Sequence, residues 1–381
     1  MVSSMKKIQM VDLKGQYQKI KSEVDKAIQN VIDNASFING PDVKEFSNEL
    51  CEYLKVKHVI PCANGTDALQ IAMMALDLQP GDEVITANFT YVATAEVIGL
   101  LKLKPVLVDV NPDTFTIDPK SIENAITSKT KAIVPVHLYG QCADMDAIME
   151  IAKKHNLYVI EDTAQAIGAD YIFKDGKKQK AGTIGTIGCT SFFPSKNLGC
   201  YGDGGALYTN IDHLAAKIRM IANHGQSVQY IHDEIGVNSR LDSIQAAILR
   251  IKLRELDQYA SARNNAAEYY DKAFENHPKI KTPVRANYSS HVFHQYTLQL
   301  NGVNRDGLKE YLASKEIPAM IYYPKPLHLQ KAYRDERYKE GDFPITEKLC
   351  ASVISLPMHT ELDEETLQYI TKEVLNYINI N

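Results

Sequence analysis

Apolar residues recur every three or four positions between residues 16 and 33, and this spacing predicts an amphipathic helix. A second helix is expected from Pro41, because proline lacks the N–H that the first helical position leaves unbonded. From residue 58 the pattern changes to short runs rich in β-formers, each followed by a longer helical stretch. These runs cover residues 58–62, 83–86, 105–110, 132–137, 157–162, 188–193 and 205–209.

Several of these runs are almost continuously apolar, as at residues 132–136 and 157–160. Strands of this kind are typical of a mostly parallel sheet with helices on both faces. Helical segments follow at residues 211–223 and 240–277. The pattern predicts a large α/β domain over residues 1–277, in which the N-terminal helices precede a seven-stranded sheet.

The last hundred residues have a different pattern. Residues 293–300 and 319–323 read as strands, and residues 305–315 and 363–379 read as helices. We therefore expect a smaller α+β domain over residues 278–381. The chain has no internal repeat or long linker, so the two domains are expected to pack closely.

Charge and cysteine content narrow the class of protein. The chain has 42 Lys and Arg against 47 Asp and Glu, a formal net charge of −5, so its overall charge does not favour nucleic acid or an anionic membrane. Its six cysteines have neither a disulfide nor a zinc-site spacing. No stretch reaches the roughly 18 apolar residues of a membrane span. We expect a cytoplasmic protein with no nucleic acid, membrane or metal partner.

Ligands of an open α/β sheet bind at the carboxyl ends of the strands, so the residues that follow each run are candidates for chemistry. Gly65 and Thr66 open an apolar helix, where free N–H groups and the helix dipole favour a phosphate; an ordinary helix cap is the alternative. Asp162 ends another run. Its carboxylate can pair with a protonated pyridine nitrogen, or it can simply cap a turn.

Two further strand ends carry cationic or amide side chains. Lys196 stands among apolar and glycine residues, an environment that can lower the pKa of an amine that forms a Schiff base; a surface lysine is the alternative. Asn238 and Arg240 precede an alanine-rich helix and offer donors to an anion, or belong to an exposed loop. Taken together, the four sites supply what a pyridoxal phosphate enzyme needs from its protein.

Seven segments share the motifs of one family: 64–69 (Asn-Gly-Thr-Asp-Ala-Leu), 81–86, 89–94, 161–165 (Glu-Asp-Thr-Ala-Gln), 191–196 (Ser-Phe-Phe-Pro-Ser-Lys), 202–205 and 238–242 (Asn-Ser-Arg-Leu-Asp). They resemble the DegT family of nucleotide-sugar aminotransferases from about residue 8 to residue 375. The resemblance implies the aspartate-aminotransferase fold (fold type I), pyridoxal phosphate as cofactor, and a homodimer with active sites at the subunit interface.

The resemblance also implies roles for single residues. Lys196 is similar to the family's cofactor-binding lysine, and Asp162 to the partner of the pyridine nitrogen. Gln165 matches the residue beside the cofactor ring and Tyr91 the aromatic that stacks on it. Phosphate-binding positions match Gly65, Thr66, Ser191 and, from the neighbouring subunit, Asn238, while Arg240 lies where the family reaches toward substrate.

The implied reaction is a two-step amino transfer from L-glutamate to a nucleotide-linked keto-sugar. Residues 12–16, 138–144, 200–205 and 225–226 are most similar to the branch that acts on UDP-linked 3-keto-2-acetamido sugars, including the 3-oxo-glucuronic acid aminotransferases of O-antigen, lipopolysaccharide and other polysaccharide pathways. A UDP- or dTDP-linked 4-keto-6-deoxy sugar and a dTDP-3-keto-6-deoxyhexose remain alternatives. A non-catalytic sensor of cofactor or nucleotide sugar is the alternative from another class.

Substrate contacts are expected from a few further side chains. A uronate needs an additional cation, for which Arg240, Lys325 and His328 are the candidates, although each also has a surface interpretation. Tyr322 and Tyr323 suit a sugar or uracil pocket because each ring has a polar tip. Since side chains alternate along a strand, only one of the two tyrosines is expected to face inward.

Overall fold

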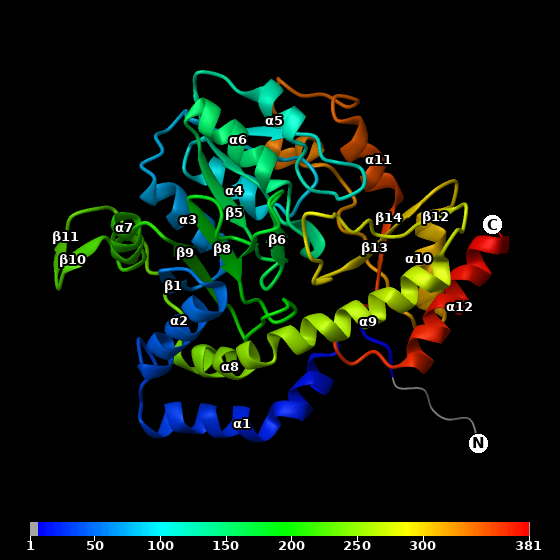
Figure 1. The fold of residues 1–381 in the computed structure, drawn as a ribbon, viewed down its shortest axis with the longest axis horizontal. Helices are drawn as coiled ribbons and strands as arrows, with labels where there is room; N and C mark the ends of the chain where they lie inside the picture. Colours follow the sequence, from blue (N-terminus) through cyan, green and yellow to red (C-terminus); the bar gives the residue numbers. More distant parts are fainter. Residues whose placement is uncertain (1–6, 381) are drawn as a thin grey trace.

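Seven strands form the central sheet, in the order β1-β9-β8-β5-β4-β2-β3 (Figure 1). The computed structural model describes residues 7–380. β9 runs antiparallel to β1 and β8, whereas the other neighbours pair in parallel. The strands are β1 His58–Cys62, β2 Glu83–Ala87, β3 Lys104–Val108, β4 Thr130–Val134, β5 Tyr158–Asp162, β8 Ile187–Ser191 and β9 Gly205–Thr209. The predicted fold class, a mostly parallel seven-stranded sheet, is confirmed.

Both faces of this sheet are buried. Neighbouring residues of a strand point to opposite faces, so Ile133 of β4 enters one apolar core and Val134 the other. Val159 and Ile160 of β5 divide in the same way. The continuous apolar runs of the sequence therefore arise from burial on both faces.

Helices from the strand connections cover the two faces. One core takes side chains from α3 Gly65–Ala75, α4 Ala93–Leu100 and α7 Asp212–Ala222. The other takes side chains from α5 Pro119–Ala125, α6 Met145–His155 and α11 Pro344–Ser352. This is the layered arrangement that parallel strands require, because each crossover returns over a face of the sheet.

Four further helices lie beyond the sheet and lead to the second half of the molecule. α8 Ser243–Arg254 packs against both α1 Leu13–Asp33 and α2 Pro41–Leu54. The predicted start of α2 at Pro41 is confirmed, and the predicted helical segment 240–277 consists of α8 and α9 Leu256–Phe274. Figure 1 shows α9 running from α8 toward the C-terminal elements.

A small antiparallel sheet and its helices form the C-terminal part. The sheet contains β12 Ile280–Lys281, β13 Tyr296–Leu300 and β14 Val353–Leu356, and α10 Arg305–Ser314 and α12 Glu364–Ile380 pack on it. Its core also includes Tyr270 of α9 and Ile8 from the N-terminal segment. The domain boundary at residue 278 stays a prediction.

One predicted strand is wrong. Residues 319–323 form no strand, and Met320 makes only an isolated bridge to Ser355. The short hairpins β6 Asp170–Ile172 with β7 Lys178–Lys180, and β10 Gln226–Val228 with β11 Ile231–His232, complete the strands. Short 3-10 turns lie at residues 138–140, 327–329 and 331–333. Within residues 7–380, no helix has both the length and the apolar character needed to cross a membrane.

Candidate active site

Several strand ends meet at one edge of the large sheet. Gly205 begins β9 opposite Cys62, the last residue of β1, and opposite Ser191, the last residue of β8. Asp162 ends β5, which pairs with β8. The turns that follow β1, β5 and β8 therefore open on the same edge, where a ligand of this fold binds.

Lys196 lies in the turn after β8. Its backbone N–H donates to Phe193 O at 2.8 Å, which fixes the turn. The side chain is half-buried, and its amine has no hydrogen-bond partner within residues 7–380. Burial lowers the pKa of this amine from 10.5 to about 8, while the nearby Asp162 carboxylate acts in the opposite direction. The environment thus favours the neutral, nucleophilic amine.

Asp162 is the second ionisable group of the site. It is 8% exposed, and its Oδ1 accepts a hydrogen bond from Ala164 N at 3.0 Å. Its Oδ2 accepts one from Thr94 Oγ1 at 3.3 Å. Burial raises the pKa of the carboxyl, and the hydrogen bond from Ala164 and the charge of Lys196 oppose that rise. A further cation placed against Asp162 stabilises its charged form, as a protonated ring nitrogen does.

The neighbouring acid, Glu161, points to the other side of the strand and anchors β5. It is fully buried, and its two oxygens accept four N–H groups. These come from His137 Nε2 at 2.9 Å, Gly182 N at 2.8 Å, Ile184 N at 2.8 Å and Gly185 N at 2.5 Å. His137 is fixed in turn, because its Nδ1 accepts from Ala143 N at 3.1 Å. This network holds the end of β5, and with it Asp162, in place.

The start of α3 forms an anion cradle. Asn64 caps the helix by accepting from Asp67 N at 2.8 Å, which leaves the N–H groups of Gly65 and Thr66 without an intrahelical acceptor. A Cβ on Gly65 would lie 2.6 Å from Ser191 Cβ, so the absence of a side chain lets the helix start approach β8 closely. Gly65, Thr66 and Ser191 are therefore together, as expected of phosphate-binding positions.

A polar and aromatic wall stands beside Asp162. Gln165 is buried and accepts from Tyr139 N at 2.7 Å, while its amide donates to the Tyr323 hydroxyl at 3.3 Å. Tyr91 is 58% exposed, and its ring lies 6.2 Å from that of Tyr323. Burial raises the pKa of Tyr323; the hydrogen bond with Gln165 opposes the rise, and the Asp162 charge adds to it. Gln165, Tyr91 and Tyr323 thus gather at the predicted site.

Tyr322 faces a different part of the same region. It lines a pocket with Ser195, the neighbour of Lys196, and its carbonyl accepts a hydrogen bond from the Tyr139 hydroxyl. Tyr323 instead bonds Gln165. Both tyrosines border the site from different directions, so the expectation that only one faces inward is wrong: the segment is no strand, and alternation does not apply to it.

Asn238 and Arg240 flank Ser239, whose hydroxyl accepts from Ala63 N at 3.0 Å and donates to Asp67 Oδ2 at 2.6 Å, so their segment is fastened beside the start of α3. Asn238 is exposed and forms an isolated bridge with Asn223. Arg240 is half-buried and lines a separate depression of 450 Å³ together with Arg219. Their roles toward phosphate and substrate stay predictions.

The structure argues against the predicted contact between His328 and substrate. The ring is 3% exposed; its Nδ1 lies 2.7 Å from Asn88 Nδ2 and its Nε2 lies 3.3 Å from Glu347 Oε1. His328 N also donates to Asn88 Oδ1 at 3.0 Å, so the residue fastens its turn to the end of β2. Lys325 is exposed, and its amine has no partner in the described part of the chain.

Sequence reasoning missed several groups of the site. Thr94 donates a hydrogen bond to Asp162, and it lies inside segment 89–94, so the family resemblance could have identified it as a site residue. His294 and Gln295 line the pocket beside Ser195, although they come from the start of the small sheet. No spacing or motif placed these two near Lys196, because only the packing of the small sheet on the large one does so.

The donor set fits pyridoxal phosphate. A half-buried lysine with a lowered pKa, a buried aspartate and a glycine-lined helix start lie at one sheet edge, and these match an aldehyde, a ring nitrogen and a phosphate. Fold and site together define a pyridoxal phosphate enzyme of the aspartate-aminotransferase type.

Comparison with known proteins identifies the family. The chain matches the DegT/DnrJ/EryC1/StrS aminotransferase family over residues 18–375. It is 47% identical to UDP-2-acetamido-2-deoxy-3-oxo-D-glucuronate aminotransferase of Pseudomonas aeruginosa, across 97% of this chain and 100% of that protein. It is 44% identical to UDP-N-acetyl-3-dehydro-alpha-D-glucosamine 3-aminotransferase of Acidithiobacillus ferrooxidans, across 95% and 96%. A Geobacillus stearothermophilus relative called pleiotropic regulatory protein is 46% identical, across 97% and 98%.

Solved structures agree. DesV of S. venezuelae superposes with a TM-score of 0.93 at 38% identity, covering 97% of this chain and 98% of that one. NtdA of Bacillus subtilis, solved with pyridoxamine phosphate, superposes with a TM-score of 0.91 at 31% identity, covering 99% and 86%. The chain belongs to the DegT/DnrJ/EryC1/StrS aminotransferase family and is a pyridoxal phosphate-dependent aminotransferase.

Proposed function

We propose that this enzyme moves an amino group from L-glutamate to carbon 3 of a UDP-linked 2-acetamido keto-sugar. The observation that carries the proposal is the meeting of Lys196, Asp162 and the α3 cradle at one sheet edge. The sugar follows from the relatives of Pseudomonas aeruginosa and Acidithiobacillus ferrooxidans, both of which are named for UDP-linked 3-oxo sugars. A role in the synthesis of surface polysaccharide, such as O-antigen or lipopolysaccharide, accords with such a substrate.

Pyridoxal phosphate, when bound, supplies an electron-withdrawing ring that stabilises negative charge on the reacting carbon. Lys196 Nζ would hold it, and the lowered pKa leaves part of the released amine neutral, so that this amine could take up a proton from the donor carbon and return it. The Asp162 carboxylate would keep the ring nitrogen protonated, and the hydrogen bond from Thr94 Oγ1 to Oδ2 orients that carboxylate. The free N–H groups of Gly65 and Thr66, with Ser191, bind the phosphate.

The aromatic and amide residues position the reactants. Gln165 is held from both sides by Tyr139 and Tyr323, so its side chain presents a fixed edge beside the ring. Tyr91 is exposed beside Tyr323 and offers a ring face for stacking. Tyr322 borders the sugar side, and Lys325 is the exposed cation that remains available for a negatively charged substrate group.

A homodimer completes the site in this proposal. Asn238 and Arg240 follow a segment, residues 228–235, that has four exposed apolar side chains. These are Val228 at 63%, Tyr230 at 82%, Ile231 at 56% and Ile235 at 87% exposure. A patch of this kind is typical of an interface, where Asn238 would reach the phosphate of the partner. The six free thiols accord with a cytoplasmic location.

The test follows the visible absorption of the purified holoenzyme. L-glutamate alone should shift the cofactor band, and a UDP-linked 3-keto-2-acetamido sugar should restore it. Lys196→Ala should abolish both changes, whereas Lys120→Ala, at an exposed lysine of α5, should leave both unchanged. Recovery of the band with dTDP- or UDP-4-keto-6-deoxy sugars, or with dTDP-3-keto-6-deoxyhexose, in place of the acetamido sugar would reject the proposed substrate.

A sensor function is the second candidate, favoured by the name of the Geobacillus stearothermophilus relative. A sensor would bind cofactor and nucleotide sugar without turnover. A holoenzyme whose absorption is unchanged by glutamate, yet which binds UDP-sugar, would place the sensor first.

A further inference from the structure

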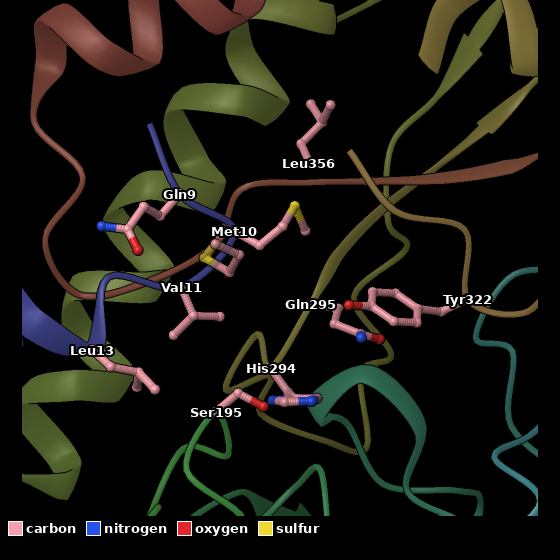
Figure 2. A pocket seen from close by; sticks show the side chains of 10 residues that line it. Gln9, Met10, Val11, Leu13, Ser195, His294, Gln295, Tyr322 and Leu356 are labelled. Carbon is pink, nitrogen blue, oxygen red and sulfur yellow. The ribbon is translucent and has the colours of Figure 1, made fainter. Parts of the chain in front are cut away.

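A pocket of 390 Å³ opens beside Lys196, between the N-terminal segment and the small sheet (Figure 2). Its size is within the range of small-molecule sites. Figure 2 shows the N-terminal segment on one side, Ser195 and His294 on another, and Gln295 with Tyr322 on a third. The full lining is Gln9, Met10, Val11, Leu13, Ser195, His294, Gln295, Tyr322, Leu356 and Met358.

Two buried polar atoms in this lining lack a partner among residues 7–380. They are Nδ1 of His294, which is 7% exposed, and Oε1 of the Gln295 side chain. A buried polar atom without a partner is unfavourable, so such atoms on residues of a pocket wall indicate hydrogen-bonding groups that a ligand can satisfy. Gln295 Oε1 requires a donor, and His294 Nδ1 can provide one in the matching tautomer.

The lining contains no charged side chain. Burial, with the charges of Lys196 and Arg263, lowers the pKa of His294 far below its ordinary value, so the ring is neutral. A carboxylate or phosphate would therefore find no cation in this pocket. The remaining wall is apolar, from Met10, Leu356 and Met358 among others. The pocket suits a neutral group that has one N–H, one carbonyl and a methyl.

We propose that this pocket holds the 2-acetamido group of the keto-sugar, an inference that rests on the proposed function. The acetamide N–H donates to Gln295 Oε1, its carbonyl accepts from His294 Nδ1, and its methyl packs on Met10 and Met358. Carbon 2 is bonded to carbon 3, so a substituent on carbon 2 must lie close to the amine that serves carbon 3. The pocket meets this condition, because Ser195 of its wall precedes Lys196. His294 and Gln295 are thus specificity-determining residues.

The test compares the binding of two stable probes, UDP-N-acetylglucosamine and UDP-glucose, by calorimetry on the holoenzyme. Wild type should bind the acetamido probe at least about tenfold more tightly than the hydroxyl probe, the ratio that one or two buried hydrogen bonds produce. Gln295→Leu and His294→Phe should each bring the two dissociation constants to within about twofold. Gln299→Leu, at a glutamine of β13 outside the pocket, should keep the wild-type ratio.

Unchanged cofactor absorption and thermal midpoint confirm that each variant is folded. A wild-type enzyme without preference, or a Gln295→Leu enzyme that keeps the full preference, would overturn the inference while the glutamate reaction still stands. A wild-type enzyme that fails to react with glutamate would overturn the proposed function, and this inference with it.

Discussion

The lowered pKa of Lys196 predicts a reactivity that can be measured without any sugar substrate. At pH 7 an amine with a pKa of about 8 is about 10% neutral, whereas one at the ordinary 10.5 is about 0.03% neutral. The concentration of nucleophilic amine at Lys196 is thus about 300-fold that of an ordinary lysine. In apoenzyme, brief reductive methylation at pH 6–11, read by peptide mass spectrometry, should give a half-maximal rate at Lys196 near pH 8.

Lys252 is the internal control. Burial lowers the pKa of its amine to about 8 as well, but that amine is buried and donates to Gly199 O at 2.5 Å. It should stay unmodified in folded protein at all these pH values. Asp162→Asn removes a negative charge that raises the Lys196 pKa, so the midpoint should move below pH 8. A Lys196 midpoint near 10.5, or an upward movement in Asp162→Asn, would contradict the account of the site.

The same shift has a consequence for stability. The unfolded chain binds a proton at Lys196 up to the ordinary pKa, whereas the folded apoenzyme releases it near pH 8. Between these values the unfolded state holds more protons, so the free energy of unfolding rises with pH. The rise is at most about 3.4 kcal/mol, the free energy that corresponds to 2.5 pKa units. In Lys196→Met apoenzyme, urea melts should lack this part of the pH dependence.

Two further predictions concern the supports of the site. Glu161→Gln places an amide NH₂ against two N–H donors whichever way the side chain turns, so it should lower the free energy of unfolding by about 3 kcal/mol in urea melts. The control Glu123→Gln, at an exposed position, should change the free energy of unfolding by less than about 0.5 kcal/mol. Equal losses in the two variants would contradict the proposed role of the Glu161 network. Gly65→Ala brings a Cβ to 2.6 Å from Ser191 Cβ, and should cost about 1–3 kcal/mol and weaken cofactor binding in a fluorescence titration. Gly99→Ala, whose Cβ meets nothing within 4 Å, should leave both quantities undiminished, and cofactor affinity equal in the two variants would count against the cradle.

The strands of the large sheet could be predicted from the local hydrophobic pattern because they are buried on both faces. Val159 and Ile160 enter different cores, so the whole run must be apolar, and that is visible in sequence. Residues 319–323 look equally apolar, but the Tyr322 carbonyl bonds the Tyr139 hydroxyl and the Tyr323 hydroxyl bonds Gln165. Hydrogen bonds to Tyr139 and Gln165 therefore take the place of strand pairing, and the local sequence does not reveal these bonds.

The residues of the candidate site also differ in how far the sequence alone could predict them. Asp162 and Lys196 follow strands of the sheet, so both the expected position of a ligand in this fold and the family resemblance predict them as site residues. The predicted substrate contact of His328 is wrong because a histidine near a recognised motif says nothing about its burial, and its Nδ1 is engaged by Asn88 Nδ2. His294 was missed because its position depends on how the small sheet packs against Ser195.

The N-terminal wall of the pocket has a consequence for how the enzyme matures. Met358 N donates to Met10 O at 3.2 Å, and Arg263 Nη1 donates to the same Met358's carbonyl at 3.0 Å. These contacts join the first and last parts of the chain, and contacts at such separations form late because they close very long loops. A nascent chain can build most of its large sheet well before Met358 leaves the ribosome. The pocket proposed for the acetamido group is therefore complete only when Met358 has been synthesised and has packed against Met10.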